Sequence, residues 1–176
     1  MKGRELIEKA MRLESVPDIP WVPFTGVHCA SLLGTDSESF LKSDKLIVEG
    51  VSRAIEIYEP DGIPVVFDLQ LEAEALGCRL IWAAQNPPSV AGHPLSSGAE
   101  LSQLKIPDKD SGRIATVLEA VNAIRKMYPD IALYGLVTGP FTLALHLLGT
   151  DIFMKMFKEE DYVPELIKFC GDVAKA

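Results

Sequence analysis

The sequence predicts an α/β fold built on parallel strands, in the form of an incomplete (β/α)8 barrel. Apolar runs at 21–25, 63–67 and 131–137 alternate with amphipathic helical segments, which is typical of right-handed crossovers in a parallel sheet. The run at 63–67 is apolar at every position, as in a strand that is covered on both faces. A closed barrel needs eight strands and about 250 residues. We therefore expect the 176 residues to be the N-terminal part of one barrel domain, with an open three-layer α/β sheet as the alternative.

The remaining elements follow from the spacing of apolar residues. Residues 1–19 are expected to form an initial helical segment, and residues 20–176 to carry the βα units. Residues 78–98 interrupt the alternation and are expected to form an irregular excursion or a hairpin. Ser37 and Ser43 are candidate N-caps. Helical periodicity predicts helices over 3–14, 44–59, 69–76, 111–128, 141–148, 151–158 and 164–175.

Composition and charge exclude several classes of protein. The chain carries 17 Lys and Arg against 25 Asp and Glu, a net charge of −8, whereas nucleic-acid binding needs clustered basic residues. Three distant cysteines without a CxxC pair argue against a disulfide framework and for a reducing compartment. The N-terminus is charged and lacks the apolar core of a signal peptide, and apolar runs end well before the ~20 residues of a membrane span. We expect a cytoplasmic protein without a membrane or nucleic-acid partner.

The candidate site follows from the rule that reactive residues in parallel barrels lie at the carboxyl ends of strands. Three such places occur, one after each apolar run. Asp68 and His28 are the catalytic candidates. The expected substrate-binding residues are Thr25, Gln70, Thr138, Gly139, Pro140, Phe141, Thr142 and His146.

Asp68 and His28 each have two interpretations. The Asp68 carboxylate would face the barrel mouth and accept hydrogen bonds from a substrate NH or OH group, or it would cap the 69–76 helix; the two roles are compatible. His28 would act as an acid, a base or a ligand. Its alternative is an ordinary loop histidine with satisfied hydrogen bonds, and the local sequence alone favours that alternative.

The Gly139–Thr142 bend allows a sharp turn from a strand into a helix. The free NH groups at the start of that helix would hold an anionic group, and the alternative is a plain strand-to-helix turn. His146 is expected to be half-buried packing unless the site extends that far. The sequence predicts no metal site in this segment, because neighbouring residues such as His28 and Cys29 point in opposite directions on an extended chain.

Three segments carry a resemblance to a known family. They are PWVPFTGVHCASLLG at 20–34, VVFDLQLEAEALGCRLIW at 65–82 and YGLVTGPFTLALHLLGTD at 134–151. In order and spacing the chain resembles the uroporphyrinogen decarboxylase superfamily, which includes the decarboxylase of haem biosynthesis and cobalamin-dependent methyltransferases. The resemblance covers almost all of the chain and about the first half of such a protein. It implies a TIM barrel of the uroporphyrinogen decarboxylase/methyltransferase type, of which the chain forms about the first three βα units.

The resemblance also separates two branches of that superfamily. Asp68 falls where the decarboxylases keep an aspartate that holds pyrrole NH groups, and His146 falls where they have a substrate-contacting tyrosine. After the first strand the decarboxylases carry two arginines that grip carboxylates, whereas this chain has no arginine from 13 to 52. A substrate with many carboxylates needs charge-assisted partners. The segment therefore looks more like the methyltransferase branch.

For that branch, the resemblance implies transfer of a methyl group between a methyl-corrinoid (cobalamin), carried by a partner protein, and a small thiol or pterin acceptor. In many members zinc activates the thiol through ligands in the second half of the barrel, which is missing here. One alternative is uroporphyrinogen decarboxylase of porphyrin biosynthesis. A second is a non-catalytic half-barrel that binds a partner protein. Either a missing half-barrel or a homo-oligomer contact is expected to cover the open edges of three strands.

Overall fold

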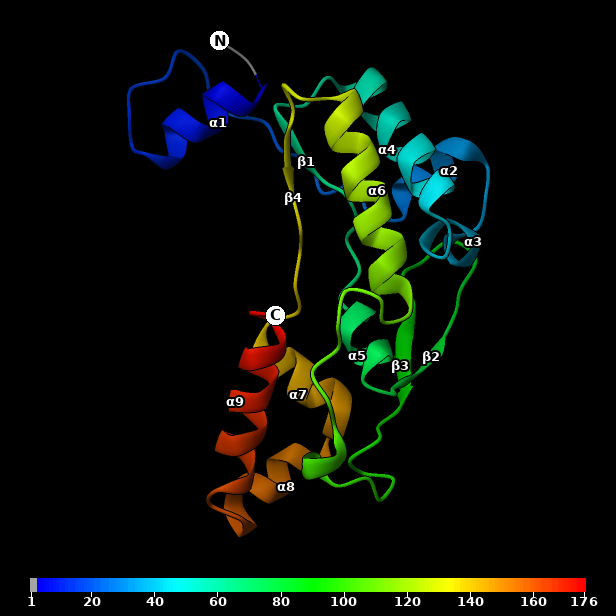
Figure 1. The fold of residues 1–176 in the computed structure, drawn as a ribbon, viewed down its shortest axis with the longest axis vertical. Helices are drawn as coiled ribbons and strands as arrows, with labels where there is room; N and C mark the ends of the chain where they lie inside the picture. The colour runs from blue at the N-terminus through cyan, green and yellow to red at the C-terminus, as the bar shows by residue number, and fades with distance from the viewer. Residues whose placement is uncertain (1–2) are drawn as a thin grey trace. The chain divides into compact units, whose positions relative to one another are not determined.

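The computed structural model describes residues 3–176, so the first two residues of the predicted 1–19 segment lie outside it. The chain divides into two units, which are described separately. Unit 1 contains residues up to 68 together with 83–87 and 116–136, and unit 2 contains 69–82, 88–115 and 137–176. The elements in chain order (Figure 1) are α1 (Gly3–Met11), α2 (His28–Leu33), α3 (Ser37–Leu41), α4 (Asp44–Tyr58), β1 (Gly62–Pro64), α5 (Leu71–Ala75), β2 (Arg79–Ile81), β3 (Ser89–Gly92), the 3-10 helix η1 (Leu101–Gln103), α6 (Arg113–Met127), β4 (Ala132–Tyr134), α7 (Pro140–Leu148), α8 (Asp151–Lys158) and α9 (Tyr162–Val173).

Unit 1 is organised on the parallel pair β1 and β4. Gly62 lies opposite Ala132 and Ile63 opposite Leu133, which confirms the predicted parallel pairing. All three residues of β1 are buried, as the uninterrupted apolar run predicts. Helix α4 and the unit 1 part of α6 lie side by side next to this pair (Figure 1).

The prediction of a strand at 21–25 is wrong, because these residues are assigned no strand. They nevertheless run along β1 in the same direction. The Trp21 carbonyl accepts a hydrogen bond from the Asp61 amide at 3.0 Å, and Gly26, with φ of +51°, lies so close to Phe67 that a Cβ atom would be 3.3 Å from the Phe67 Cβ. Pro20 and Pro23 have no amide hydrogen to donate, so the segment cannot form a regular ladder.

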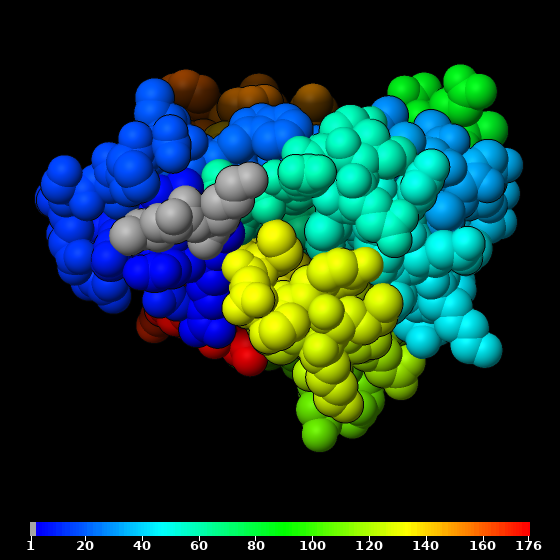
Figure 2. All heavy atoms as spheres, turned by 90° about the horizontal axis from the view of Figure 1, so that it is seen from above, coloured from blue at the N-terminus to red at the C-terminus, as the bar shows by residue number. Residues whose placement is uncertain are grey.

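Helix α1 is tied to the start of β1 through Asp61. One carboxylate oxygen accepts from the Gly3 amide at 2.6 Å and the other from the Trp21 amide at 3.0 Å. The Arg4 amide also donates to the Asp130 carbonyl at 2.7 Å. The blue N-terminal residues accordingly lie against the yellow residues near 130 in Figure 2. The predicted 3–14 helix ends three residues earlier than expected, at Met11.

Two short helices, α2 and α3, were not among the predicted elements. Helix α2 packs against α4 at Gly50, where a Cβ atom would be 2.7 Å from the Phe40 ring and 3.1 Å from the Cys29 Cβ. Only glycine allows so close an approach. The predicted N-cap Ser43 is confirmed, because its hydroxyl accepts from the Leu46 amide at 3.3 Å.

The predicted N-cap Ser37 is wrong by one residue. Asp36 caps α3 instead, since its carboxylate accepts from the Ser39 amide at 2.8 Å. Ser37 is fully buried and donates its hydroxyl hydrogen to the Ala84 carbonyl at 3.1 Å. Aspartate and serine are both good caps, so the local sequence could not separate the two positions.

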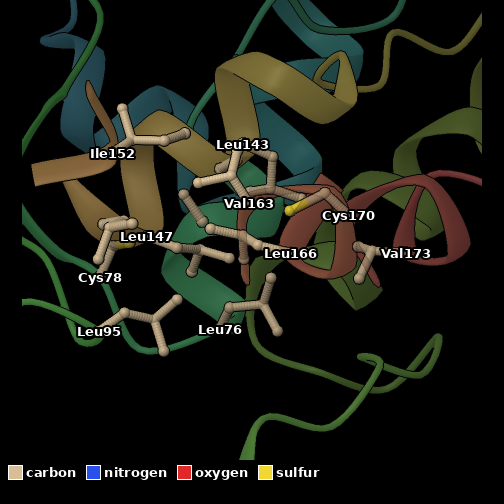
Figure 3. Packing of buried hydrophobic residues seen from close by; sticks show 13 residues of the cluster. Leu76, Cys78, Leu95, Leu143, Leu147, Ile152, Val163, Leu166, Cys170 and Val173 are labelled. Atoms are coloured by element: carbon tan, nitrogen blue, oxygen red, sulfur yellow. The ribbon is translucent and has the colours of Figure 1, made fainter. Parts of the chain in front are cut away.

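Unit 2 is a helical layer with a hairpin. Strands β2 and β3 pair antiparallel, with Ile81 opposite Ser89, which confirms the predicted excursion or hairpin. Helices α5, α7, α8 and α9 enclose one apolar core (Figure 3). Its members with no exposed surface are Ala73, Leu143, Ala144, Leu147, Leu148, Ile152, Leu166 and Cys170. Among residues 3–176, no helix is long and apolar enough to cross a membrane.

Candidate functional site

In unit 1, the carboxyl ends of β1 and β4 lie at the same edge of the pair, because the strands are parallel. The Val65 amide continues this pairing by donating to the Tyr134 carbonyl at 3.3 Å. Asp68 follows β1 by four residues and is 3% exposed. A carboxylate that is nearly buried at this edge fits the predicted catalytic position. Its predicted contact with a substrate remains a prediction.

Thr25 and His28 follow the extended first segment of unit 1. The Thr25 hydroxyl accepts a hydrogen bond from the Cys29 thiol at 3.2 Å. His28 is exposed and begins α2, and its Nε2 atom lies 2.7 Å from the Tyr58 hydroxyl. The Trp21 ring contacts the same tyrosine edge-on, with ring centres 6.4 Å apart. His28 therefore has an identified hydrogen-bond partner and remains accessible to solvent.

Thr138 opens the predicted turn in unit 2 and is 1% exposed. Its amide donates to Glu72 Oε1 at 3.1 Å, and its hydroxyl lies 2.9 Å from Glu72 Oε2 and 2.8 Å from the Leu69 carbonyl. These bonds fix the start of the bend. Glu72 is 8% exposed and was not predicted as a site residue, because no local spacing marks its partner 66 positions away.

The rest of the bend leads directly into α7. Gly139 is the N-cap, and Pro140 occupies the first turn, where its missing amide hydrogen costs no hydrogen bond. Phe141 is 43% exposed, and Thr142 is exposed. No side chain caps the N-terminus of α7. The anion-holding role of this bend remains a prediction.

The last two predicted residues also lie in unit 2. Gln70 is half-buried at the N-cap position of α5, so the alternative prediction of Asp68 as the N-cap of this helix is wrong. His146 lies in the last turn of α7 and is partly buried, in agreement with the packing role expected for it. A separate groove of about 580 Å³ occurs in unit 1 between α4 and α6. It is lined by Leu33, Asp44, Lys45, Val48, Glu49, Ser52, Arg53, Glu56, Ala123 and Met127, a set without any predicted site residue.

Comparison with known proteins identifies the family. The model of the uroporphyrinogen decarboxylase (URO-D) family matches residues 2–176. The chain belongs to the URO-D family. Among curated relatives, the methylcobamide:CoM methyltransferase MtbA of Methanosarcina mazei is 30% identical over 175 residues, covering 96% of this chain and 51% of that protein. The methylated-thiol–coenzyme M methyltransferase of the same organism is 36% identical over 109 residues, covering 58% and 29%.

A solved structure shows the same fold for this URO-D chain. A methyltransferase from Methanosarcina mazei superposes with a TM-score of 0.85 at 24% sequence identity, covering 95% of this chain and 51% of that one. The fold is thus that of part of a URO-D-type barrel. The two MtbA relatives match nearly the whole of this chain, and the chain spans about half of their length.

Zinc, which the methyltransferase branch suggests, has no ligand set in the part of this URO-D chain that the structure describes. No group of three or more His, Cys, Asp or Glu side chains is placed to hold a metal ion there. Burial raises the pKa of the Cys29 thiol, and it raises the pKa of both Cys78 and Cys170 to about 12. Metals bind the thiolate form, so burial disfavours these thiols as metal ligands, and all three cysteines pack in the core.

The raised thiol pKa values predict that the protein is destabilised by alkali. Above pH 9 the unfolded chain loses thiol protons that the folded chain retains up to about pH 12 at Cys78 and Cys170. The unfolded state then binds fewer protons, so the free energy of unfolding falls as pH rises. Urea unfolding at pH 8, 9 and 10 measures this, with a Cys78→Ala/Cys170→Ala variant as the control. The variant should show a flatter decline, and an equal decline in both proteins would contradict the assignment.

Proposed function

We propose that the protein is a corrinoid-dependent methyltransferase, which moves a methyl group between a methyl-corrinoid and a small thiol such as coenzyme M. The main support is the similarity to methylcobamide:CoM methyltransferases, which extends along nearly the whole chain. A further relative, MtaA of Methanosarcina barkeri, is 31% identical over 129 residues. A thiol acceptor is favoured over a pterin because the names of these relatives specify CoM.

The chemistry requires few groups from this chain. The thiol sulfur forms a bond to the methyl carbon, the cobalt–carbon bond breaks with its electron pair left on cobalt, and the thiol proton leaves to a base. We assign His28 as a candidate for that base, since an imidazole nitrogen can take up a proton and His28 is exposed. Asp68 would orient the acceptor through hydrogen bonds. Within unit 2, the NH groups of the Gly139–Thr142 bend are a separate candidate for holding an anionic group at the start of α7.

The decarboxylase alternative is disfavoured by charge. No arginine occurs from 13 to 52, the region where the first extended segment and α2 lie. Binding of a polycarboxylate in a protein site depends on such bidentate partners. The corrinoid would be carried by a partner protein, and any zinc ligands would lie outside these 176 residues.

The test uses the protein expressed from its complete gene, incubated with methylcobalamin and coenzyme M. We expect the absorption spectrum of methylcobalamin to change only when both enzyme and thiol are present. Parallel reactions replace the thiol by tetrahydrofolate, or both substrates by uroporphyrinogen. Conversion of uroporphyrinogen without any thiol-dependent change in methylcobalamin would refute the proposal in favour of the decarboxylase.

A further inference from the structure

Helix α7 of unit 2 is bonded at both ends by residues of the same unit that lie far from it in sequence, within 69–78 and 93–96. At the N-terminal end, Glu72 accepts from the amide of Thr138 and contacts its hydroxyl. The same hydroxyl lies 2.8 Å from the Leu69 carbonyl. Both carboxylate oxygens of a buried glutamate are thus engaged with the residue that precedes the Gly139–Thr142 bend.

At the C-terminal end, three successive carbonyls of α7 accept hydrogen bonds from Cys78 and from residues 93–96. The His146 carbonyl accepts from His93 Nδ1 at 2.8 Å and from the Cys78 thiol at 3.2 Å. The Leu147 carbonyl accepts from the Leu95 amide at 3.0 Å. The Leu148 carbonyl accepts from the Ser96 hydroxyl. The last carbonyls of a helix have no partner within it, so residues 93–96 supply the missing donors.

Close packing at the end of α7 accompanies these hydrogen bonds. Gly149 ends α7 with φ of +65°, and a Cβ atom there would be 2.9 Å from Cδ2 of the His93 ring. The imidazole therefore packs directly on the glycine backbone. The Leu143 and Leu147 side chains on the buried face of α7 lie in the core shown in Figure 3. Helix α7 has nine residues and is about 13 Å long. Hydrogen bonds hold its two ends, and apolar packing holds its buried face.

We propose that residues 69–78 and 93–96 of unit 2 together set the position of the Gly139–Thr142 bend, and that Glu72 and His93 are positioning residues for the reaction. This inference rests on the proposed function only for its kinetic consequence. Loss of Glu72 would release the N-terminal end of α7, and loss of His93 would release its C-terminal end. A displacement of about 1 Å in a substrate-positioning group can lower a rate about 100-fold.

The test compares Glu72→Ala with Glu72→Gln and His93→Ala with His93→Asn, in the protein expressed from its complete gene. The Gln carbonyl can accept from the Thr138 amide while its NH2 group donates to the hydroxyl, and the Asn amide can replace His93 Nδ1 as a donor. Ile167→Ala, which trims a partly buried residue of the same core, controls for general loss of stability. Two measurements are made, amide hydrogen exchange and steady-state methyl transfer.

We expect Glu72→Ala to speed exchange of the Thr138 amide about tenfold or more, and His93→Ala to do the same at Leu95. The acceptor KM should rise and kcat/KM fall about 100-fold in both, with recovery in the Gln and Asn variants. Unchanged exchange at Thr138 and Leu95 in the alanine variants, or an equal kinetic loss in Ile167→Ala, would overturn the proposal. Because exchange is measured without substrate, a failure of the methyltransferase assignment would be recognised separately by the absence of wild-type turnover.

Discussion

Replacement of Asp68 by asparagine is expected to lower kcat/KM for methyl transfer about 100-fold or more. The carboxylate is 3% exposed and follows β1 at the carboxyl edge of the parallel pair. Asparagine keeps the size of the side chain but removes its charge and one acceptor oxygen. Groups that act directly on a reacting proton or hydrogen bond typically contribute 10²–10⁴-fold. Steady-state kinetics with methylcobalamin and coenzyme M measure the effect.

The matched control for Asp68 is Asp110→Asn, which makes the same chemical change on an exposed residue. It should leave kcat/KM unchanged. Circular dichroism of both variants would show whether either has lost structure. A folded Asp68→Asn protein with kinetics within about twofold of the wild type would show that Asp68 takes no part in the reaction.

Leu147→Ala is expected to lower the free energy of unfolding of unit 2 by about 2–5 kcal/mol. Leu147 has no exposed surface and lies among the labelled side chains from α7, α8 and α9 in Figure 3. The cost combines lost apolar burial with the cavity that alanine leaves. Urea unfolding followed by Trp82 fluorescence reports on this unit, provided that Trp21 of unit 1 is first replaced by phenylalanine.

Phe157→Ala provides the comparison for Leu147. Phe157 lies on α8 of the same unit and is 87% exposed, so its loss should change stability by less than about 0.5 kcal/mol. Equal destabilisation by Leu147→Ala and Phe157→Ala would mean that the apolar cluster does not form as described.

The helices were the most predictable part of the fold. The bounds of the 151–158 helix match α8, and 141–148 differs from α7 by one residue at its start. Apolar spacing suffices there because each helix buries one continuous face. The short helices α2 and α3, with six and five residues, are too short for a periodic pattern. Helix α2 depends on close packing against α4 at Gly50.

Strands were less predictable, because a strand depends on partners elsewhere in the chain. The apolar residues at 21–25 do lie beside β1, but the prolines prevent a regular ladder of hydrogen bonds. The contacts of Glu72 and His93 were missed for a related reason. Their partners lie 66 and 53 positions away, and the neighbouring residues contain no pattern that predicts these contacts.

The most direct measurement of the central claim follows the methyl group itself. The protein from its complete gene is incubated with ¹³C-methylcobalamin and coenzyme M, and the products are examined by ¹³C NMR. We predict a new thioether methyl signal that grows as the cobalt-bound methyl signal declines, and that is strongly reduced in Asp68→Asn. Label that stays on cobalt with the wild-type protein, whatever the thiol concentration, would contradict the assignment.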